Sequence, residues 1–244
     1  NETSTGTKIN CLKEIGEFCD EHDLLFVVDA ISVLGGDDLP VDDWHVDICI
    51  AGSQKCLMCP PGLALLSVSD KAWSVIEKST NTFYFNLKSY RKYEKEGQTP
   101  YTPAIPLYYA LDEALKMMRE EGLENSIHRH KTCAKAVYEA TECMGLVPFA
   151  EEKFRSNTVI AINNPSKISD SSLRELLRNK YNVVIAGGQG KLKGSIFRIG
   201  VMGMITQAEV LQVIGALNMA LSDLGFKSVF DDSVSAAREV FKEK

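Results

Sequence analysis

The apolar run Leu24-Leu25-Phe26-Val27-Val28, which ends in Asp29, constrains the fold of this chain more than any other feature. A short run without alternating polar residues predicts a strand that is buried on both faces, as in a parallel sheet covered by helices. Apolar residues at helical spacing precede it over 8–22, and 47–51 and 63–68 predict two further strands. This order of elements predicts an α/β fold with a mainly parallel sheet.

The second half of the chain predicts a separate unit. Residues 79–103 are polar and aromatic without a clear period, so we expect a long irregular loop. Helices are predicted at 106–121 and 123–144, on either side of Gly122. Beyond them we expect strands and helices at 158–162, 169–179, 183–186, 195–201 and 207–224. We therefore predict a large domain over 1–122 and a smaller α+β domain over 123–244.

The bulk composition excludes several classes of partner. The net charge of −6 gives no reason to expect binding to nucleic acid or to an anionic membrane, and no apolar run approaches the roughly 20 residues that span a bilayer. The start of the chain has no signal-peptide pattern and no initiator Met, so we expect a processed chain or a piece of a longer one. Seven cysteines, an odd count, favour buried free thiols and a cytoplasmic location.

Two side chains follow predicted strands at one sheet edge. Asp29 ends the apolar run, where α/β proteins bind ligands, although it can equally cap the following turn. Lys55 follows Gly52-Ser53-Gln54 after the next strand. An amine removed from water there becomes a nucleophile toward aldehydes, whereas the alternative is a solvated loop lysine.

The C-x-x-C pair Cys56 and Cys59 lies directly beside this lysine. A zinc site wants further ligands, and neither a second C-x-x-C nor a nearby histidine pair is present. A redox pair should open a helix, which Pro60-Pro61-Gly62 prevents. We therefore expect these thiols to fill space.

Three other features carry weaker signals. The GGQG at 187–190 precedes another strand, so it predicts a turn rather than a phosphate loop. Arg198 alternates with Phe197 and Ile199, so it faces away from the core or into a cleft, where it can bind a carboxylate or form a surface salt bridge. The four histidines are scattered, and we expect His128 and His130 to be exposed on a helix rather than to form a metal pair.

Taken together, NETSTG, VVDAISVLGG, DICIAGSQKCLMCPPG, YTPAIP, GLENSIHRH and FRIGVMG resemble, in order over 1–225, the class V (fold type I) pyridoxal-phosphate aminotransferases. The alanine–glyoxylate and serine–pyruvate branch is the most similar. The resemblance implies the C-terminal part of a fold type I large domain followed by a small α+β domain.

The resemblance also implies roles for individual residues. Lys55 would form the Schiff base with pyridoxal 5′-phosphate and move the proton in catalysis, and Asp29 would pair with the pyridine nitrogen. Ile31 would pack under the ring, Thr3 would lie near the 3-oxygen, and Gln54 would contact the phosphate. Arg198 would hold the substrate carboxylate. Tyr101 and Thr102 would reach the phosphate of a neighbouring subunit in a homodimer, although Ala104 replaces a hydroxyl residue of the family there.

The sequence leaves three functions open. The first is a transaminase that moves an amino group from alanine or serine to glyoxylate or pyruvate. The second is another enzyme of the same class, such as a cysteine desulfurase or a lyase. The third is a split subunit without activity, because the phosphate loop and the ring-stacking aromatic residue of the family find no match here. We expect this chain alone to bind cofactor weakly and to turn over poorly.

Overall fold

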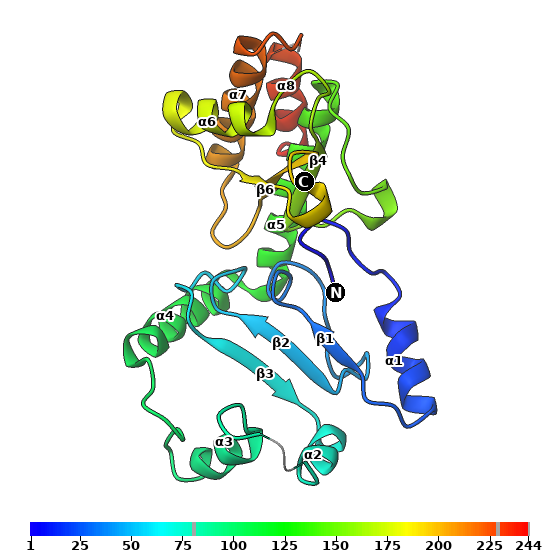
Figure 1. The fold of residues 1–244 in the computed structure, drawn as a ribbon, viewed down its shortest axis with the longest axis vertical. Helices are drawn as coiled ribbons and strands as arrows, with labels where there is room; N and C mark the ends of the chain where they lie inside the picture. Colours follow the sequence, from blue (N-terminus) through cyan, green and yellow to red (C-terminus); the bar gives the residue numbers. More distant parts are fainter. Residues whose placement is uncertain (80–81, 228–229, 244) are drawn as a thin grey trace.

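Three strands from the first half of the chain form one sheet, in the order β1 (Val27–Asp29), β2 (Ile48–Gly52) and β3 (Ala64–Val68). In this computed structural model, which describes residues 1–79, 82–227 and 230–243, β1 runs parallel to β2, whereas β3 runs antiparallel to it. The connection over 53–63 is too short for the crossover that a parallel partner needs. The α/β fold is confirmed, and the parallel pairing is that of β1 with β2 (Figure 1).

The prediction that the first strand is buried on both faces is wrong for this chain. Val28 is buried, but Val27 is 51% exposed and Leu24 and Leu25 are exposed as well. Helix α1 (Leu12–Glu21) packs on the buried side so closely that a β-carbon on Gly16 would lie 1.9 Å from the carbonyl oxygen of Trp44. One face of the sheet is therefore covered, while Val27 and Leu66 on the other face are exposed.

The segment after β3 is more regular than its sequence suggests. It holds α2 (Asp70–Ile76) and α3 (Leu87–Glu94), so the prediction of an irregular loop over 79–103 is wrong for α3. Residues 80–81 of that loop lie outside the described residues. Asn86 caps α3 by accepting the N–H groups of Lys88 and Ser89, and no side chain of α3 is buried, which explains why it shows no apolar period.

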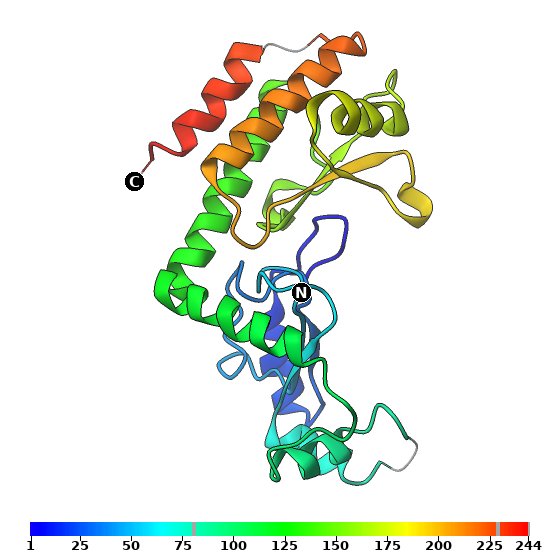
Figure 2. The same ribbon diagram turned by 90° about the vertical axis from the view of Figure 1, so that its left-hand side faces the viewer.

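Helices α4 (Ile105–Glu121) and α5 (Leu123–Cys143) are confirmed and meet at a corner (Figure 2). Gly122 alone separates them, with φ at 88° and ψ at 135°. Such positive φ values are readily adopted by glycine. Helix α5 then connects the part that contains the first sheet to the part that contains the second.

The second sheet has the order β4 (Val159–Asn163), β6 (Ile196–Gly200) and β5 (Ala186–Gly187), with every pairing antiparallel. Helix α6 (Asp170–Tyr181) contacts β5, and α7 (Gln207–Asp223) packs against α5 and α6. Helix α8 (Phe230–Val240), which the sequence did not predict, packs against α5 and α7. Two short 3-10 turns, Glu152–Phe154 and Gly190–Leu192, complete this part. The second turn joins β5 to β6 and confirms the turn predicted at GGQG.

The histidines and cysteines follow their predictions only in part. His128 is exposed as expected, but the prediction for His130 is wrong, because it is fully buried and its Nδ1 lies 2.7 Å from the carbonyl oxygen of Ser126. All seven cysteines are free; Cys11 and Cys143 are exposed, Cys19 is half-buried, and the other four are buried. Among the described residues, no helix combines the length and apolar character needed to cross a bilayer.

Candidate active site

The parallel pairing of β1 with β2 brings Asp29 and Lys55 to the same edge of the first sheet. Asp29 is opposite Ile50 in the register, and β2 ends at Gly52, just before the turn that carries Lys55. The Asp29 side chain is exposed, and its Oδ1 accepts the N–H of Ile31 at 3.0 Å. The carboxylate therefore caps its turn with one oxygen, while Oδ2 makes no hydrogen bond to any residue that the structure describes.

Two side chains, those of Ile31 and Gln54, lie close to Gly52 at the end of β2. A β-carbon on Gly52 would lie 3.0 Å from Oε1 of Gln54 and 3.3 Å from Cγ2 of Ile31. The absence of a side chain on Gly52 thus lets an amide and an apolar side chain approach this backbone closely.

The turn that carries Lys55 is held by buried polar contacts. Ser53 is fully buried, and its hydroxyl donates to the carbonyl oxygen of Pro60 at 2.8 Å. The thiol of Cys56 donates to the carbonyl oxygen of Ser32 at 3.3 Å. Lys55 itself is half-buried, and within the described ranges its amine has no hydrogen bond or ion pair. The turn therefore presents a free amine from a fixed backbone.

Both cysteines of the C-x-x-C are buried, as side chains that fill space would be. Cys56 is 1% exposed, and burial raises the pKa of its thiol to about 12. Cys59 points elsewhere, with its sulfur 3.7 Å from the carbonyl oxygen of Leu107. The residues described by the structure contain no cluster of three or more His, Cys, Asp or Glu side chains that could hold a metal ion.

The first residues of the chain connect this edge to Arg198 in the second sheet. The main-chain nitrogen of Asn1 donates to the main-chain oxygen of Asp29 at 2.7 Å. Three residues later, the carbonyl oxygen of Ser4 accepts Nη1 of Arg198 at 3.0 Å. Thr3 lies between these contacts, is exposed, and hydrogen-bonds through its hydroxyl to that of Thr5. The segment at 1–6 therefore spans the space between the two sheets.

Arg198 is half-buried and held by backbone rather than by an acid. Its Nε donates to the carbonyl oxygen of Gly187 at 2.9 Å, in addition to the contact with Ser4. Throughout the described part of the chain it forms no ion pair, so the alternative of a surface salt bridge is not observed. With two of five N–H groups engaged, the guanidinium keeps donors for a carboxylate.

The loop after β6 completes the path back to Lys55. A β-carbon on Gly203 would lie 3.4 Å from Cγ of Met58 and 3.8 Å from the carbonyl oxygen of Lys55. We call the backbone and side chains along this path, from Asp29 through Ser4, Arg198 and Gly203 to Lys55, the site ring. Sequence reasoning missed Ser4, Gly187 and Gly203 because backbone groups and close approaches carry no side-chain signal, although Gly203 falls within the quoted FRIGVMG.

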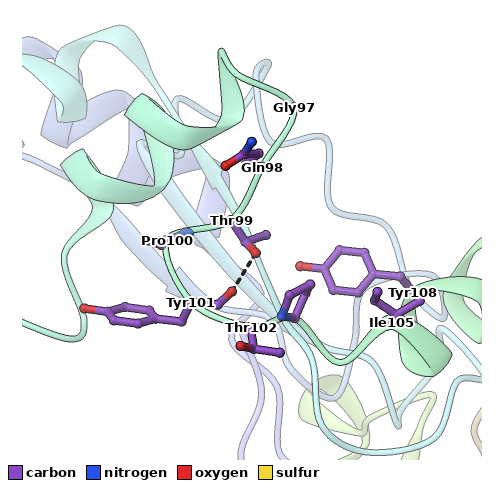
Figure 3. A pocket seen from close by; sticks show the side chains of 9 residues that line it. Gly97, Gln98, Thr99, Pro100, Tyr101, Thr102, Ile105 and Tyr108 are labelled. Atoms are coloured by element: carbon purple, nitrogen blue, oxygen red, sulfur yellow. Dashed lines mark hydrogen bonds between the residues drawn. The ribbon is translucent and has the colours of Figure 1, made fainter.

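Tyr101 and Thr102 lie in a different place. They line an open pocket of about 1050 Å³ that extends from Gly97 to Tyr108 and contains no residue of the site ring. Figure 3 shows the ring of Tyr101 pointing away from Tyr108, while the hydroxyl of Thr99 donates to the carbonyl oxygen of Tyr101 at 2.7 Å. The volume of this pocket is not a guide to the chemistry, because the free amine and the carboxylate lie in the site ring. One copy of the chain does not gather all the predicted residues.

Comparison with known proteins identifies relatives over almost the whole chain. The family described as Aminotransferase class-V matches residues 1–213. An uncharacterized aminotransferase of Methanocaldococcus jannaschii is 50% identical over 243 residues, 98% of this chain and 63% of its own length. A serine–glyoxylate aminotransferase of Arabidopsis thaliana is 36% identical over 97% of this chain and 60% of its own length.

Solved structures agree with these sequence matches. The ureidoglycine–glyoxylate aminotransferase of Bacillus subtilis superimposes with a TM-score of 0.94 at 33% identity, covering all of this chain and 64% of that one. A pyridoxamine–pyruvate aminotransferase of Mesorhizobium loti gives 0.92 at 31% identity, over 98% of this chain and 62% of that one. The chain thus spans less than two thirds of the length of these relatives.

Proposed function

The chain belongs to the class-V aminotransferase family, and on this premise we propose that it carries part of the active site of a transaminase that depends on pyridoxal 5′-phosphate. The donor would be a small amino acid such as alanine or serine, and the acceptor glyoxylate or pyruvate. One observation carries the proposal: the free amine of Lys55 and the carboxylate of Asp29 share one sheet edge, and the site ring leads from them to Arg198.

The residues at this edge fit the cofactor chemically. The bound cofactor supplies an aldehyde that reacts with amines and a ring that takes up electrons. Lys55 offers an amine for the aldehyde. Asp29 offers a carboxylate for the ring nitrogen, and Ile31 offers an apolar side chain for the face of the ring. The amide of Gln54, which lies close to Gly52 together with Ile31, would bind the phosphate. Thr3 would donate a hydroxyl from the segment that begins beside Asp29.

Lys55 and Asp29 have complementary tasks in this proposal. The amine of Lys55, which the buried turn holds in place, would take the proton from the α-carbon of the substrate. A carboxylate near a ring nitrogen favours the protonated form of that nitrogen. Asp29 can favour the protonated nitrogen because its Oδ2 accepts no hydrogen bond from the described residues.

Arg198 would bind and orient the substrate. Its contacts with the carbonyl oxygens of Gly187 and Ser4 fix the plane of the guanidinium. The remaining N–H groups can then grip a carboxylate with two parallel hydrogen bonds. A substrate held in this way presents its α-carbon in one orientation only.

The choice of a transaminase over a desulfurase rests on the thiols. A desulfurase needs a nucleophilic cysteine that can move to the substrate. Cys56 is buried and keeps its proton, since burial raises its pKa to about 12, and Cys59 is buried as well. Two of the relatives are named as aminotransferases for serine and glyoxylate and for ureidoglycine and glyoxylate. These names support a small amino acid as donor and glyoxylate as acceptor.

We further propose a cytoplasmic homodimer in which Tyr101 and Thr102 reach the phosphate bound to the partner. The lining of their pocket includes no residue of the site ring, which supports a role in the other subunit rather than in their own. We also propose the domains 1–122 and 123–244. In support, the largest hydrophobic core contains only residues from 133 onward, and two smaller cores contain only residues from 12 to 118.

The test is an absorbance spectrum of the intact protein that contains this chain, with added cofactor. We expect a band that borohydride removes, and mass spectrometry should then locate the reduced cofactor on Lys55. Lys55→Ala should lack the band, whereas Lys78→Ala, which changes an exposed lysine beyond α2, should retain it. Absence of the band in the unsubstituted protein would favour the inactive split subunit. Persistence of the band in Lys55→Ala would refute the assignment of this lysine.

A further inference from the structure

The partly buried side chain of Arg129 on α5 contacts the loop of the site ring that contains Gly203. Arg129 has five N–H groups, and all five have an acceptor. Nε and Nη2 bind the two carboxylate oxygens of Glu121 at 2.6 and 2.8 Å. Nη1 donates to the carbonyl oxygens of Gly203 at 2.5 Å and Ile205 at 3.4 Å. The remaining donor of Nη2 lies 3.4 Å from Oγ of Ser126.

This arrangement joins three separate parts of the chain. Glu121 ends α4, Arg129 lies in the second turn of α5 beyond the Gly122 corner, and Gly203 belongs to the loop after β6. Ser126 adds a fourth contact, since its hydroxyl donates to the carbonyl oxygen of Gly35 at 2.9 Å. The side chains of Arg129 and Glu121 are only 20% and 23% exposed. Their pairing lowers the pKa of Glu121 and raises that of Arg129, so both stay charged across the neutral range.

The loop that Arg129 holds lies between the two proposed catalytic elements. It begins directly after β6, which carries Arg198, and its Gly203 packs against the turn of Lys55 and Met58. The carbonyl oxygens of Gly203 and Ile205 both accept hydrogen bonds from Arg129. A shift of this loop changes the spacing between the amine and the guanidinium that orients the substrate.

We propose that Arg129, fixed by Glu121, is a positioning residue that sets the distance between Lys55 and Arg198 through the loop at 201–205. This inference rests on the proposed function. It assigns a role to a residue that is not among those proposed to bind the cofactor or the substrate. Since a misplacement of about 1 Å can cost roughly 100-fold in rate, loss of the contact should be visible in donor binding and turnover while the cofactor stays attached.

The experiment compares Arg129→Met, Arg129→Lys and Glu121→Gln with the control Arg119→Met in the intact protein. Arg119 is an exposed arginine near the end of α4 and lies outside the site ring. The first measurement is hydrogen exchange of the cofactor-free proteins. We expect exchange in the peptide at 200–206 to rise in Arg129→Met and less in Arg129→Lys, and to stay unchanged in Arg119→Met, because freed carbonyls loosen the loop.

The second measurement follows the loaded proteins. We expect the borohydride-sensitive band to persist in every variant. KM for the amino donor should rise about tenfold or more in Arg129→Met and to a smaller extent in Glu121→Gln. Lysine lacks the planar fork, so Arg129→Lys should recover only part of the loss.

Three results would decide whether Arg129 positions the site, serves the structure only, or belongs to a protein without the proposed function. Unchanged exchange at 200–206 in a folded Arg129→Met protein, as judged by circular dichroism, overturns the inference. Faster exchange with unchanged donor KM also overturns it, because the contact would then be structural only. If the unsubstituted protein has no reducible band, the proposed function itself fails, and that result is seen before any Arg129 variant is compared.

Discussion

Phe197 and Arg198 are neighbours on β6 that should separate stability from function. Phe197 is 0% exposed and lies opposite Ile162 of β4 in the second sheet. Arg198 points to the other side of the strand and contacts the carbonyl oxygens of Ser4 and Gly187. Replacing each by alanine therefore tests whether one face of this strand stabilises the fold while the other serves the substrate.

The two substitutions should change the free energy of unfolding by different amounts, because Phe197 is fully buried and Arg198 is only half-buried. Phe197→Ala removes a fully buried aromatic ring, which costs about 3–5 kcal/mol. That is a large part of the roughly 5–15 kcal/mol by which proteins are stable, and at about 2–4 °C per kcal/mol it lowers Tm by roughly 6–20 °C. Arg198→Ala loses two hydrogen bonds at partly exposed carbonyl groups that water can reach, so we expect about 1 kcal/mol.

The assay is urea unfolding followed by far-ultraviolet circular dichroism, with KM for the amino donor measured in parallel. Phe197→Leu is the matched control and should cost less than Phe197→Ala, since more of the volume is retained. We expect Arg198→Ala to raise KM strongly and to leave the cofactor band in place. The reasoning is refuted if Arg198→Ala destabilises as much as Phe197→Ala, or if Phe197→Ala costs less than about 1 kcal/mol.

Three further predictions concern other parts of the chain. Iodoacetamide at mild alkaline pH should label exposed Cys11 and Cys143 in the native protein but not Cys56, whose pKa of about 12 keeps it protonated; rapid labelling of Cys56, mapped by mass spectrometry, would contradict its burial. Burial raises the pKa of Glu2 above its usual 4.5, so this group should favour the folded state at low pH and should lower the stability as the pH rises through the raised value. Urea titrations at several pH values should show a smaller loss of stability with rising pH in Glu2→Gln. The same dependence of stability on pH in both proteins would count against this role of Glu2. Thr206→Ala removes the capping box of α7 and should cost about 1 kcal/mol in the same assay, whereas no change would mean that the cap contributes nothing.

The sequence predicted elements well where packing imposes a period. Helices α4 and α5 were found because their buried side chains repeat at helical spacing, whereas β2 and β4 were found as short apolar runs. Helix α3 buries no side chain and therefore has no period to read. His130 was misplaced for a related reason: a helix can satisfy Nδ1 of a histidine with its own backbone, here the carbonyl oxygen of Ser126, and so bury a side chain that looks polar.

The candidate site was predictable in its side chains but not in its framework. Asp29 and Lys55 stood out because reactive groups at strand ends meet at one sheet edge. The carbonyl oxygens of Ser4 and Gly187 hold Arg198, yet any residue type has such a carbonyl. Gly203 and its contact with Arg129 depend on a loop path that only the tertiary structure defines.

The single residue between α4 and α5 limits how the two parts of the molecule can move. Two torsion angles, φ and ψ of Gly122, are the soft degrees of freedom at that corner, since both helices are otherwise continuous. Rotation about either torsion angle changes the angle between the axes of α4 and α5. The ion pair between Glu121 and Arg129 spans this corner and opposes such a rotation, as does the segment at 1–6, which contacts both parts.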